Sequence, residues 1–326
     1  TRFNILFQAR YFRTNKLGFM QNLKPEHRYS NFLKPKFWPT WLLIGLMRLL
    51  ARLPHGARMG LGRFLGHRLY KLKGSRYKTA RGNINACFPE LSEEEREQLV
   101  YDTFISNATG YMESLASWWG NYTPYIDKLT VHGIENLKEA QERGKGILLI
   151  GGHFSMLDLA GPLLNSVTQF GYMYRPQNNP LLDAAIERAR LVYNARPYSK
   201  RQVKDMIEDI KAGALVWYAP DQDMGKKQSV FAPFFGVPAS SITTTAWIAR
   251  ETGCTVLRLA QYREDNDGHY SLYFGKPYEN FPSDDEVENA TIINKGLEED
   301  IRRHKEQYLW LHRRFKTRPD GEPSLY

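Results

Sequence analysis

Short apolar runs alternate with longer amphipathic stretches through most of the chain, and this alternation limits the fold more than any other feature. Helices are expected near residues 92–119, 155–167, 180–194, 201–212, 241–253 and 286–303. Four runs have the length and composition of buried strands: Gly146–Gly151, Leu215–Ala219, Thr255–Ala260 and Tyr270–Phe274. Strands that alternate with helices predict an α/β layer architecture with one central sheet.

The composition sets the size of the fold and its redox environment. The chain has 326 residues, 42% of them apolar and 25% charged, which is enough for one large domain or two small ones. Cys87 and Cys254 match no metal or redox spacing, so we expect no disulfide framework and a reducing compartment. With no internal repeat or clear linker, we predict one α/β domain over residues 82–326, preceded by a distinct region over residues 1–81.

Positive charge is concentrated in that first region. Residues 1–81 contain 18 Lys and Arg and one acidic residue, Glu26, a net charge of +17. The rest of the chain contains 27 basic and 34 acidic residues, a net charge of −7. Such asymmetry is typical of a surface that meets nucleic acid or anionic lipid headgroups. The region has no zinc-finger spacing, RRM signature or KH loop, so nucleic acid is disfavoured.

Apolar residues within the basic region favour a membrane surface. The run Trp38–Leu50 is strongly apolar and opens with two tryptophans, but a full span needs about 20 apolar residues. A leucine stripe at helical spacing follows among basic residues: Leu61, Leu65, Leu69 and Leu72. We therefore predict interfacial helices on anionic lipids, with the basic flanks on the cytoplasmic side. The alternative is an ordinary core helix with a solvated basic face.

The segment Gly151–Asp158 carries the strongest chemical signal, because it directly follows a predicted strand, where active sites of α/β sheets gather. Its two glycines allow a sharp turn, which would bring the His153 ring back to the Asp158 carboxylate. A carboxylate fixes the tautomer of an imidazole and stabilises its cation. Without a G-x-S-x-G nucleophile motif, this pair suits deprotonation of a substrate hydroxyl that then attacks an acyl carbonyl.

Two other interpretations of this segment stay open. His153 and Asp158 are equally consistent with structural roles, as a residue before the helix and a solvated partner of the helix dipole. A metal site is less favoured, because only one histidine is available and no ligand spacing recurs. Its ligands would be His153, Asp158, Asp221 and Asp223.

Five segments in this order resemble the late, or secondary, acyltransferases of lipid A biosynthesis, the lauroyl and myristoyl enzymes that act on Kdo-bearing precursors. The resemblance spans most of the chain from about residue 40, and the last segment is long and distinctive. The matching segments are Gly152–Asp158, Tyr174–Asp183, Trp217–Gly225, Val230–Pro238 and Glu306–Pro319. Many members of that family carry Glu where this chain has Asp158, which requires the pair to approach more closely here.

This resemblance implies a fold and a reaction. The fold would be that of the glycerol-3-phosphate acyltransferases, with a central mixed sheet flanked by helices. The protein would be an enzyme of the bacterial inner membrane, with its active site on the cytoplasmic face. It would transfer an acyl chain from acyl carrier protein to a hydroxyl on a hydroxyacyl chain of a lipid A precursor. No metal or redox cofactor is expected, because the thioester is already activated.

The remaining residues of the matching segments have two interpretations each. Arg175 and Arg190 are expected to bind phosphate or polarise the thioester oxygen, or else to form structural salt bridges. Asp221 and Asp223 are expected to support the dyad or an arginine, or else to cap a loop. Phe234 and Phe235 either border an acyl-chain pocket or pack in the core. The basic segment His312–Lys316 either contacts headgroup phosphates or forms a solvated patch.

Two rival functions remain. A phospholipid-pathway acyltransferase acting on a glycerophosphate would share the His153–Asp158 logic, but the segment Tyr308–Phe315 argues against it. A non-catalytic membrane-surface or nucleic-acid adaptor would have no need of a His–Asp pair after a strand.

Overall fold

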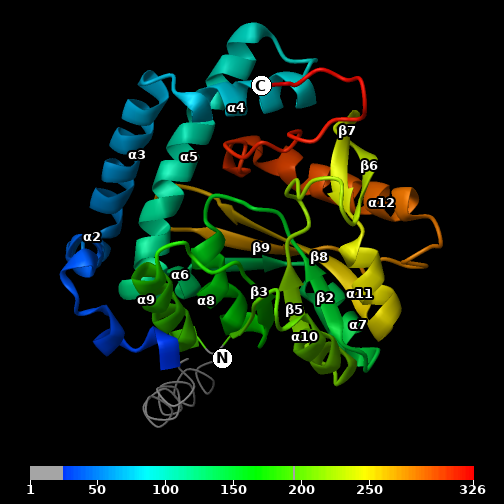
Figure 1. The fold of residues 1–326 in the computed structure, drawn as a ribbon, viewed down its shortest axis with the longest axis horizontal. Coiled ribbons are helices and arrows are strands. Elements are labelled where there is room, and N and C mark those ends of the chain that lie inside the picture. Colours follow the sequence, from blue (N-terminus) through cyan, green and yellow to red (C-terminus); the bar gives the residue numbers. More distant parts are fainter. Residues whose placement is uncertain (1–24, 194) are drawn as a thin grey trace.

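The computed structural model describes residues 25–193 and 195–326, so the first 24 residues of the predicted basic region lie outside it. A seven-stranded mixed sheet of order β1-β9-β8-β2-β5-β3-β4 forms the centre (Figure 1). Strands β8 and β9 pair antiparallel, and every other pair in this sheet is parallel. Its strands are β1 (Leu129–His132), β2 (Ile147–Ile150), β3 (Gly171–Met173), β4 (Arg196–Tyr198), β5 (Leu215–Tyr218), β8 (Thr255–Arg263) and β9 (Tyr270–Phe274).

The central strand β2 shows why the sheet is covered on both faces. All four of its residues are buried, and successive side chains point to opposite faces. Ile147 and Leu149 pack in one core with α6 (Thr123–Asp127), α7 (Ile134–Glu142) and α8 (Leu157–Val167). Leu148 and Ile150 pack in the other with α10 (Val203–Lys211), α11 (Thr244–Thr252) and α12 (Glu286–Arg303). The result is a three-layer α/β/α arrangement.

The predicted α/β architecture is confirmed, and the four predicted strands are present as β2, β5, β8 and β9. The sequence pattern did not predict β1, β3 and β4, which have only three or four residues. It also did not predict the separate antiparallel hairpin of β6 (Ser229–Phe234) and β7 (Val237–Ile242). The hairpin was hidden because each of its strands contains a proline, which weakens the strand signal. The helix expected over residues 180–194 is shorter, because α9 (Pro180–Arg190) ends in a 3₁₀ turn.

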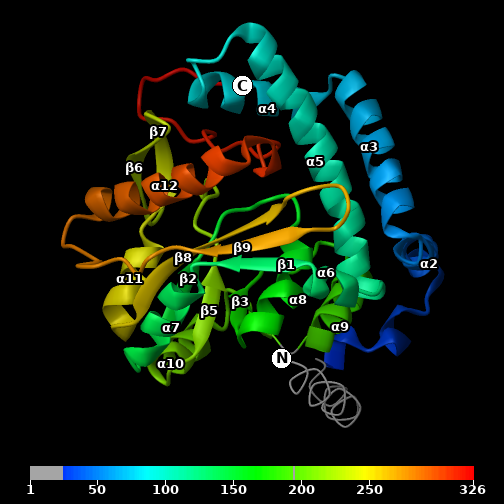
Figure 2. The same cartoon turned by 180° about the vertical axis from the view of Figure 1, so that it is seen from behind.

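The remaining helices lie along one flank of the sheet. They are α2 (Trp38–Ala51), α3 (His55–Lys71), α4 (Ser75–Cys87) and α5 (Glu93–Trp119). Helix α5 begins at a capping box between Ser92 and Glu95, which satisfies its first backbone donors. Figures 1 and 2 show α3 running beside α5, at the end of the molecule away from α7, α10 and α11. Short 3₁₀ helices are η2 (Pro25–His27), η3 (Tyr29–Phe32), η4 (Pro35–Phe37), η5 (Leu191–Tyr193) and η6 (Lys305–Gln307).

The outer faces of α2 and α3 are apolar and exposed. Leu42 and Leu72 are 78% and 74% exposed. Other exposed apolar side chains on these faces are Trp38, Leu43, Leu46, Leu49, Phe64, Leu65 and Leu69. The opposite faces pack inward, Ile44 against α9 and Met59 against α5. Within the described ranges, no helix has both the length and the apolar character needed to cross a bilayer. Membrane binding by these helices, and the division at residue 81, stay predictions.

Candidate active site

Two adjacent parallel strands place a histidine and an aspartate opposite each other. Strands β2 and β5 pair in register, with Ile150 beside Tyr218 at their carboxyl ends. His153 follows Ile150 by three residues, and Asp221 follows Tyr218 by three residues. The shared register therefore continues beyond the sheet and brings the two side chains together at the sheet edge where α/β active sites form.

The His153–Asp221 contact is a paired hydrogen bond. One Asp221 oxygen lies 2.6 Å from His153 Nδ1, and the other accepts the His153 backbone N–H at 2.8 Å. The Asp221 side chain is only 1% exposed, whereas that of His153 is 25% exposed. Burial lowers the pKa of His153, but the Asp221 charge and hydrogen bond outweigh it and raise the pKa above its ordinary value. The imidazole is thus held by Nδ1, with Nε2 left for a substrate.

The pKa of Asp221 moves in the opposite direction. Burial raises it, but the His153 charge, the two His153 hydrogen bonds and the Tyr308 hydroxyl together hold the pKa well below its ordinary value. Asp221 therefore stays ionised and can stabilise an imidazolium at His153.

The predicted contact between His153 and Asp158 is wrong. Asp158 lies in the first turn of α8, where its Oδ1 accepts hydrogen bonds from Arg190 Nε and Trp118 Nε1, both at 3.0 Å. Arg190 Nη2 forms a second bond to the same oxygen. The Asp158 charge outweighs burial and raises the pKa of Arg190 above its ordinary value. Arg190 therefore pairs with the carboxylate that was predicted to hold His153. Of the two roles predicted for Arg190, the structural salt bridge is the one observed.

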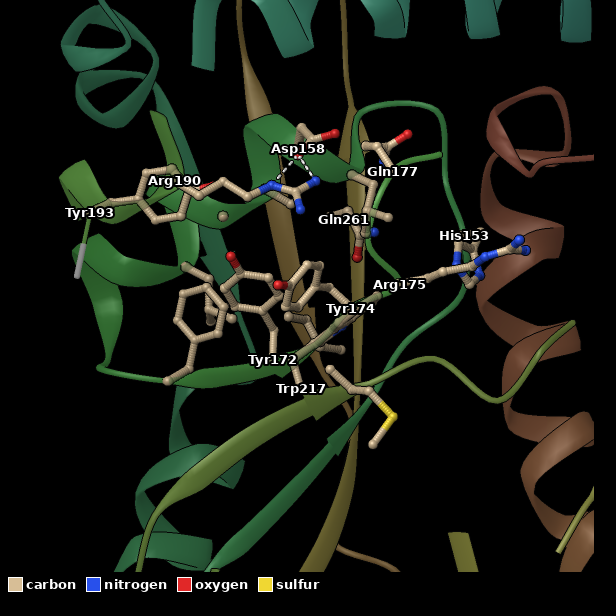
Figure 3. A pocket seen from close by; sticks show the side chains of 17 residues that line it. His153, Asp158, Tyr172, Tyr174, Arg175, Gln177, Arg190, Tyr193, Trp217 and Gln261 are labelled. Carbon is tan, nitrogen blue, oxygen red and sulfur yellow. Dashed lines mark hydrogen bonds and ion pairs between the residues drawn. The ribbon is translucent and has the colours of Figure 1, made fainter. Parts of the chain in front are cut away.

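His153 and the Arg190–Asp158 pair border one cavity of about 210 Å³, and Asp221 lies behind His153, outside the lining. In Figure 3 the Arg190–Asp158 pair and His153 lie on separate sides of it. Its polar lining includes His153, Asp158, Tyr172, Tyr174, Arg175, Gln177, Arg190 and Gln261. Its apolar lining includes Leu157, Ala160, Gly161, Leu164, Phe170 and Leu259. The cavity thus has polar side chains near the His153 imidazole and an apolar wall elsewhere. Such a cavity can receive a molecule that has a reactive polar group and a hydrocarbon chain.

Gly151 is needed for space. Neither Gly151 nor Gly152 has a positive φ, so the turn does not depend on left-handed backbone. A Cβ at residue 151 would lie 2.5 Å from the Nε1 atom of Trp217, a residue of the cavity wall. The glycine therefore lets the indole approach the backbone directly before His153.

Arg175 and Gln261 supply unsatisfied polar groups to the cavity. Arg175 is exposed and forms no ion pair with any acid in the described ranges. Gln261 is 1% exposed and its Nε2 donates to Gly152 O at 3.4 Å, whereas its Oε1 meets no donor among residues 25–193 and 195–326. Sequence analysis missed Gln261, which stands within the apolar strand β8. The signal that could have found it is a polar amide in an otherwise buried strand.

Four predicted site residues lie outside the cavity lining: Asp221, which contacts His153, and Asp223, Phe234 and Phe235. Asp223 accepts hydrogen bonds from Gly225 N at 2.9 Å and from Thr317 N at 2.6 Å, so it anchors the loop after β5 to the C-terminal segment. Phe234 and Phe235 do not line this cavity, and of their two predicted roles, core packing is the one observed, in the same cluster as Trp310. They face the core because the β6–β7 hairpin packs on α12. No group of three or more His, Cys, Asp or Glu in the described part of the chain is arranged for a metal ion.

The C-terminal segment holds the loop that carries His153. Leu309 N donates to His153 O at 2.9 Å, and Ser155 N donates to Gln307 O at 2.7 Å. Between them, Phe154 and Tyr308 form an isolated antiparallel bridge. The loop after β2 is therefore paired on one side with the loop after β5 and on the other with residues 307–309.

Comparison with known proteins gives consistent matches over nearly the whole chain. A family model described as bacterial lipid A biosynthesis acyltransferase matches residues 26–317. The chain is 38% identical over 301 residues to a lipid A biosynthesis lauroyltransferase of Escherichia coli (strain K12), covering 90% of this chain and 96% of that protein. It is 35% identical over 304 residues to a lipid A biosynthesis palmitoleoyltransferase of the same strain, covering 93% and 99%.

A solved structure is also similar. The 1-acyl-sn-glycerophosphate acyltransferase PlsC from Thermotoga maritima aligns over 70% of this chain and 96% of that chain, at 14% identity and a TM-score of 0.38. A similarity this weak carries no argument about fold or function.

Proposed function

The chain belongs to the bacterial lipid A biosynthesis acyltransferase family and is an acyltransferase, and we propose that it moves a fatty acyl chain from acyl carrier protein to a hydroxyl on a hydroxyacyl chain of a lipid A precursor. One observation carries this proposal. His153 is held through Nδ1 by the buried Asp221, beside a cavity that continues into an apolar wall. A base next to an apolar pocket suits acyl transfer to an alcohol.

The reaction takes two steps. His153 Nε2 removes the proton of the acceptor hydroxyl while its oxygen attacks the thioester carbonyl, forming a tetrahedral intermediate with a negative oxygen. When the intermediate collapses, the new C–O bond to the acceptor remains and the C–S bond of the thioester breaks. The departing thiolate takes the proton back from the His153 imidazolium, so the enzyme ends in its starting state. Asp221 fixes the imidazole tautomer and stabilises the imidazolium between the two steps.

Arg175 stabilises the oxyanion in this proposal. Its guanidinium lines the same cavity as His153 and has no acidic partner in the described ranges. A cation that is not neutralised by the protein can respond to charge that develops on the substrate. Arg190 is not available for this role, because its Nε and Nη2 atoms both donate hydrogen bonds to Asp158, which also neutralises its charge. The Arg190–Asp158 pair instead fixes α9 against α8 and shapes the cavity wall. We propose no metal or redox cofactor, because the thioester is already activated.

The acyl chain lies along the apolar wall formed by α8 and its neighbours. Leu164 and Phe170 line this wall and are nearly fully buried. Gly161 also lines it, between Leu157 at the start of α8 and Leu164 further along the helix. The names of the two relatives specify lauroyl and palmitoleoyl chains at nearly equal identity to this chain. Overall sequence identity to these relatives therefore does not determine the acyl length. We assign the choice of acyl length to individual side chains of this wall.

We also propose that α2 and α3 bind the cytoplasmic face of the inner membrane. Their outer faces combine exposed leucines with exposed Arg48, Arg68 and Lys71. A basic amphipathic surface binds anionic lipid by burial of apolar area and by about 1 kcal/mol for each basic residue near the surface. Such binding would bring the cavity to a lipid-borne acceptor. Sedimentation with vesicles of anionic and of neutral lipid tests this arrangement, and equal binding to both would contradict the electrostatic part.

The central test is a direct comparison of acceptors. Purified protein is incubated with an acylated carrier protein and either a lipid A precursor or lysophosphatidate, and products are identified by mass spectrometry. We expect one acyl mass added to the lipid A precursor and none to lysophosphatidate. The His153→Ala variant is the control for catalysis by this site. Transfer to lysophosphatidate alone would replace the proposed acceptor with a glycerophosphate.

A further inference from the structure

A second cavity, of about 350 Å³, opens between the start of α4 and the C-terminal segment. In Figures 1 and 2 the C-terminal segment passes beside α4 at the end of the molecule opposite α10. Six residues line this cavity: Ser75, Arg76, Thr79, His312, Arg313 and Lys316. Two stretches more than 230 residues apart in the sequence thus contribute a single cationic surface.

The cations of this cavity have no negative partners. Arg76, Arg313 and Lys316 form no ion pair with an acid in the described ranges, whereas nearby Arg81 and Arg318 pair with Glu93 and Glu322. Arg76 donates to Leu311 O at 2.9 Å, which directs its side chain along the C-terminal segment. Three exposed positive charges around one hollow create a positive potential that attracts an anion and weakens as salt rises.

Hydrogen-bond donors add to the charge. The His312 ring lines the cavity, and within the described residues its buried Nε2 has no hydrogen-bond partner. Gly74, which precedes α4, provides no side-chain cap, so the first backbone N–H groups of this 13-residue helix have no side-chain acceptor from that residue. Ser75 and Thr79 add hydroxyls. Guanidinium groups, an ammonium and neutral donors around one space form the donor set that binds phosphate oxygens.

The cavity is connected to the loop that carries the base. His312 N donates to Leu309 O at 3.1 Å, and Leu309 N donates to His153 O at 2.9 Å. The three residues from Leu309 to His312 span at most about 10 Å. The cationic cavity therefore lies close enough to His153 for one substrate molecule to reach both. Asn83 of α4 fixes this spacing by donating to Trp310 O and His312 O, both at 2.7 Å.

We propose that this cavity is a phosphate-binding site that holds a phosphate of one of the two substrates while its acyl chemistry takes place at His153. The proposal rests on the proposed function for the identity of the substrates, but phosphate binding itself does not. The phosphate has two possible sources, the headgroup of the lipid acceptor or the phosphodiester of the donor's prosthetic arm.

The first experiment measures binding without catalysis. The variant Arg313→Gln/Lys316→Gln removes two exposed charges but keeps a polar, unbranched side chain at each position. Inorganic phosphate is titrated into this variant and the wild type by calorimetry at low salt. We expect affinity to fall on the order of 10- to 100-fold, the size of two charge-assisted contacts. The matched control, Lys138→Gln/Lys204→Gln, removes two exposed, unpaired charges elsewhere and should bind as the wild type does. Equal phosphate affinity in all three proteins would overturn the proposal.

The second experiment identifies the source by kinetics. If the acceptor supplies the phosphate, the variant raises KM for a phosphorylated acceptor at least about tenfold, and a dephosphorylated acceptor reacts equally with both proteins. If the donor supplies it, KM rises for the acylated carrier protein instead. Unchanged KM values for both substrates would exclude a role in the reaction. A wild type that binds phosphate but transfers no acyl group would refute the proposed function and leave the phosphate site standing.

Discussion

Two buried ion pairs at the centre of this molecule have similar composition and opposite consequences. His153 and Asp221 meet beyond the ends of β2 and β5, and Arg263 and Glu113 meet between β8 and α5. Both carboxylates are only 1% exposed. Glu113 receives two donors from Arg263, at 2.6 and 2.7 Å, and a third from the Tyr270 hydroxyl at 2.7 Å. The Arg263–Glu113 pair is therefore closed.

The His153–Asp221 pair is open. Asp221 satisfies only Nδ1 of the imidazole, and the ring borders a cavity. Burial and ionic pairing alone thus do not distinguish a reactive site from a structural brace, because both pairs have them. The distinguishing feature is a polar atom that the protein leaves for a ligand.

The largest expected effect is on the open pair. Replacing His153 with Ala removes the base, so kcat should fall about 10²- to 10⁴-fold, the usual contribution of general-base catalysis. Stability should fall as well, because the buried Asp221 carboxylate loses the imidazole that pairs with it. Initial rates and thermal melting of the purified protein measure the two effects. Wild-type turnover in this variant would remove His153 from the mechanism.

Breaking the closed pair should lower stability and leave the rate nearly unchanged. Glu113→Gln leaves the Arg263 charge buried without its counter-charge, so the free energy of unfolding should drop by about 3–5 kcal/mol. The rate per folded molecule should stay near that of the wild type, because Glu113 does not line the cavity. Urea unfolding and active-site-normalised rates test this prediction. A large rate loss at unchanged stability would place Glu113 in the reaction.

The pH profile separates the two pairs further. The base must be neutral, and Asp221 raises the pKa of His153 above its ordinary value. We therefore expect kcat/KM to decline as pH falls through a pKa higher than that of a free imidazole. In Asp221→Asn the raising contribution is lost and burial lowers the pKa, so the inflection should move to lower pH while the maximal rate falls. An unmoved inflection would show that another group controls it, and Asp158→Asn serves as the comparison.

The smallest expected effect concerns the acyl chain. A Cβ at residue 161 would lie 3.1 Å from the Tyr193 ring, so Gly161→Ala narrows the apolar wall of the cavity. Product masses should shift toward shorter chains when donors of several lengths compete. Gly60→Ala is the matched control, because a Cβ there meets no atom within 4 Å. An identical product distribution in all three proteins would place the chain elsewhere.

The sequence predicted the layers of this fold well, because the buried strands and their helices have strong periodic patterns. It also predicted which loops form the site, since His153 and Asp221 each come shortly after a predicted strand. It did not predict which carboxylate meets His153. That choice depends on β5 lying beside β2 in register and on Arg190 reaching Asp158 from α9. Strand order and competition between partners are tertiary properties that local spacing does not contain.

The contacts of residues 307–309 with the loop of His153 have a consequence for biosynthesis. Both strands that position His153 and Asp221 are translated well before the segment that clamps their loop. A nascent polypeptide therefore carries the reactive imidazole long before the loop is fastened. Competence for acyl transfer arises only once this late segment has left the ribosome and docked. Premature termination upstream of Gln307 would remove the buried core residues Trp310 and Phe315 together with the clamp, so neither the core nor the catalyst would be complete.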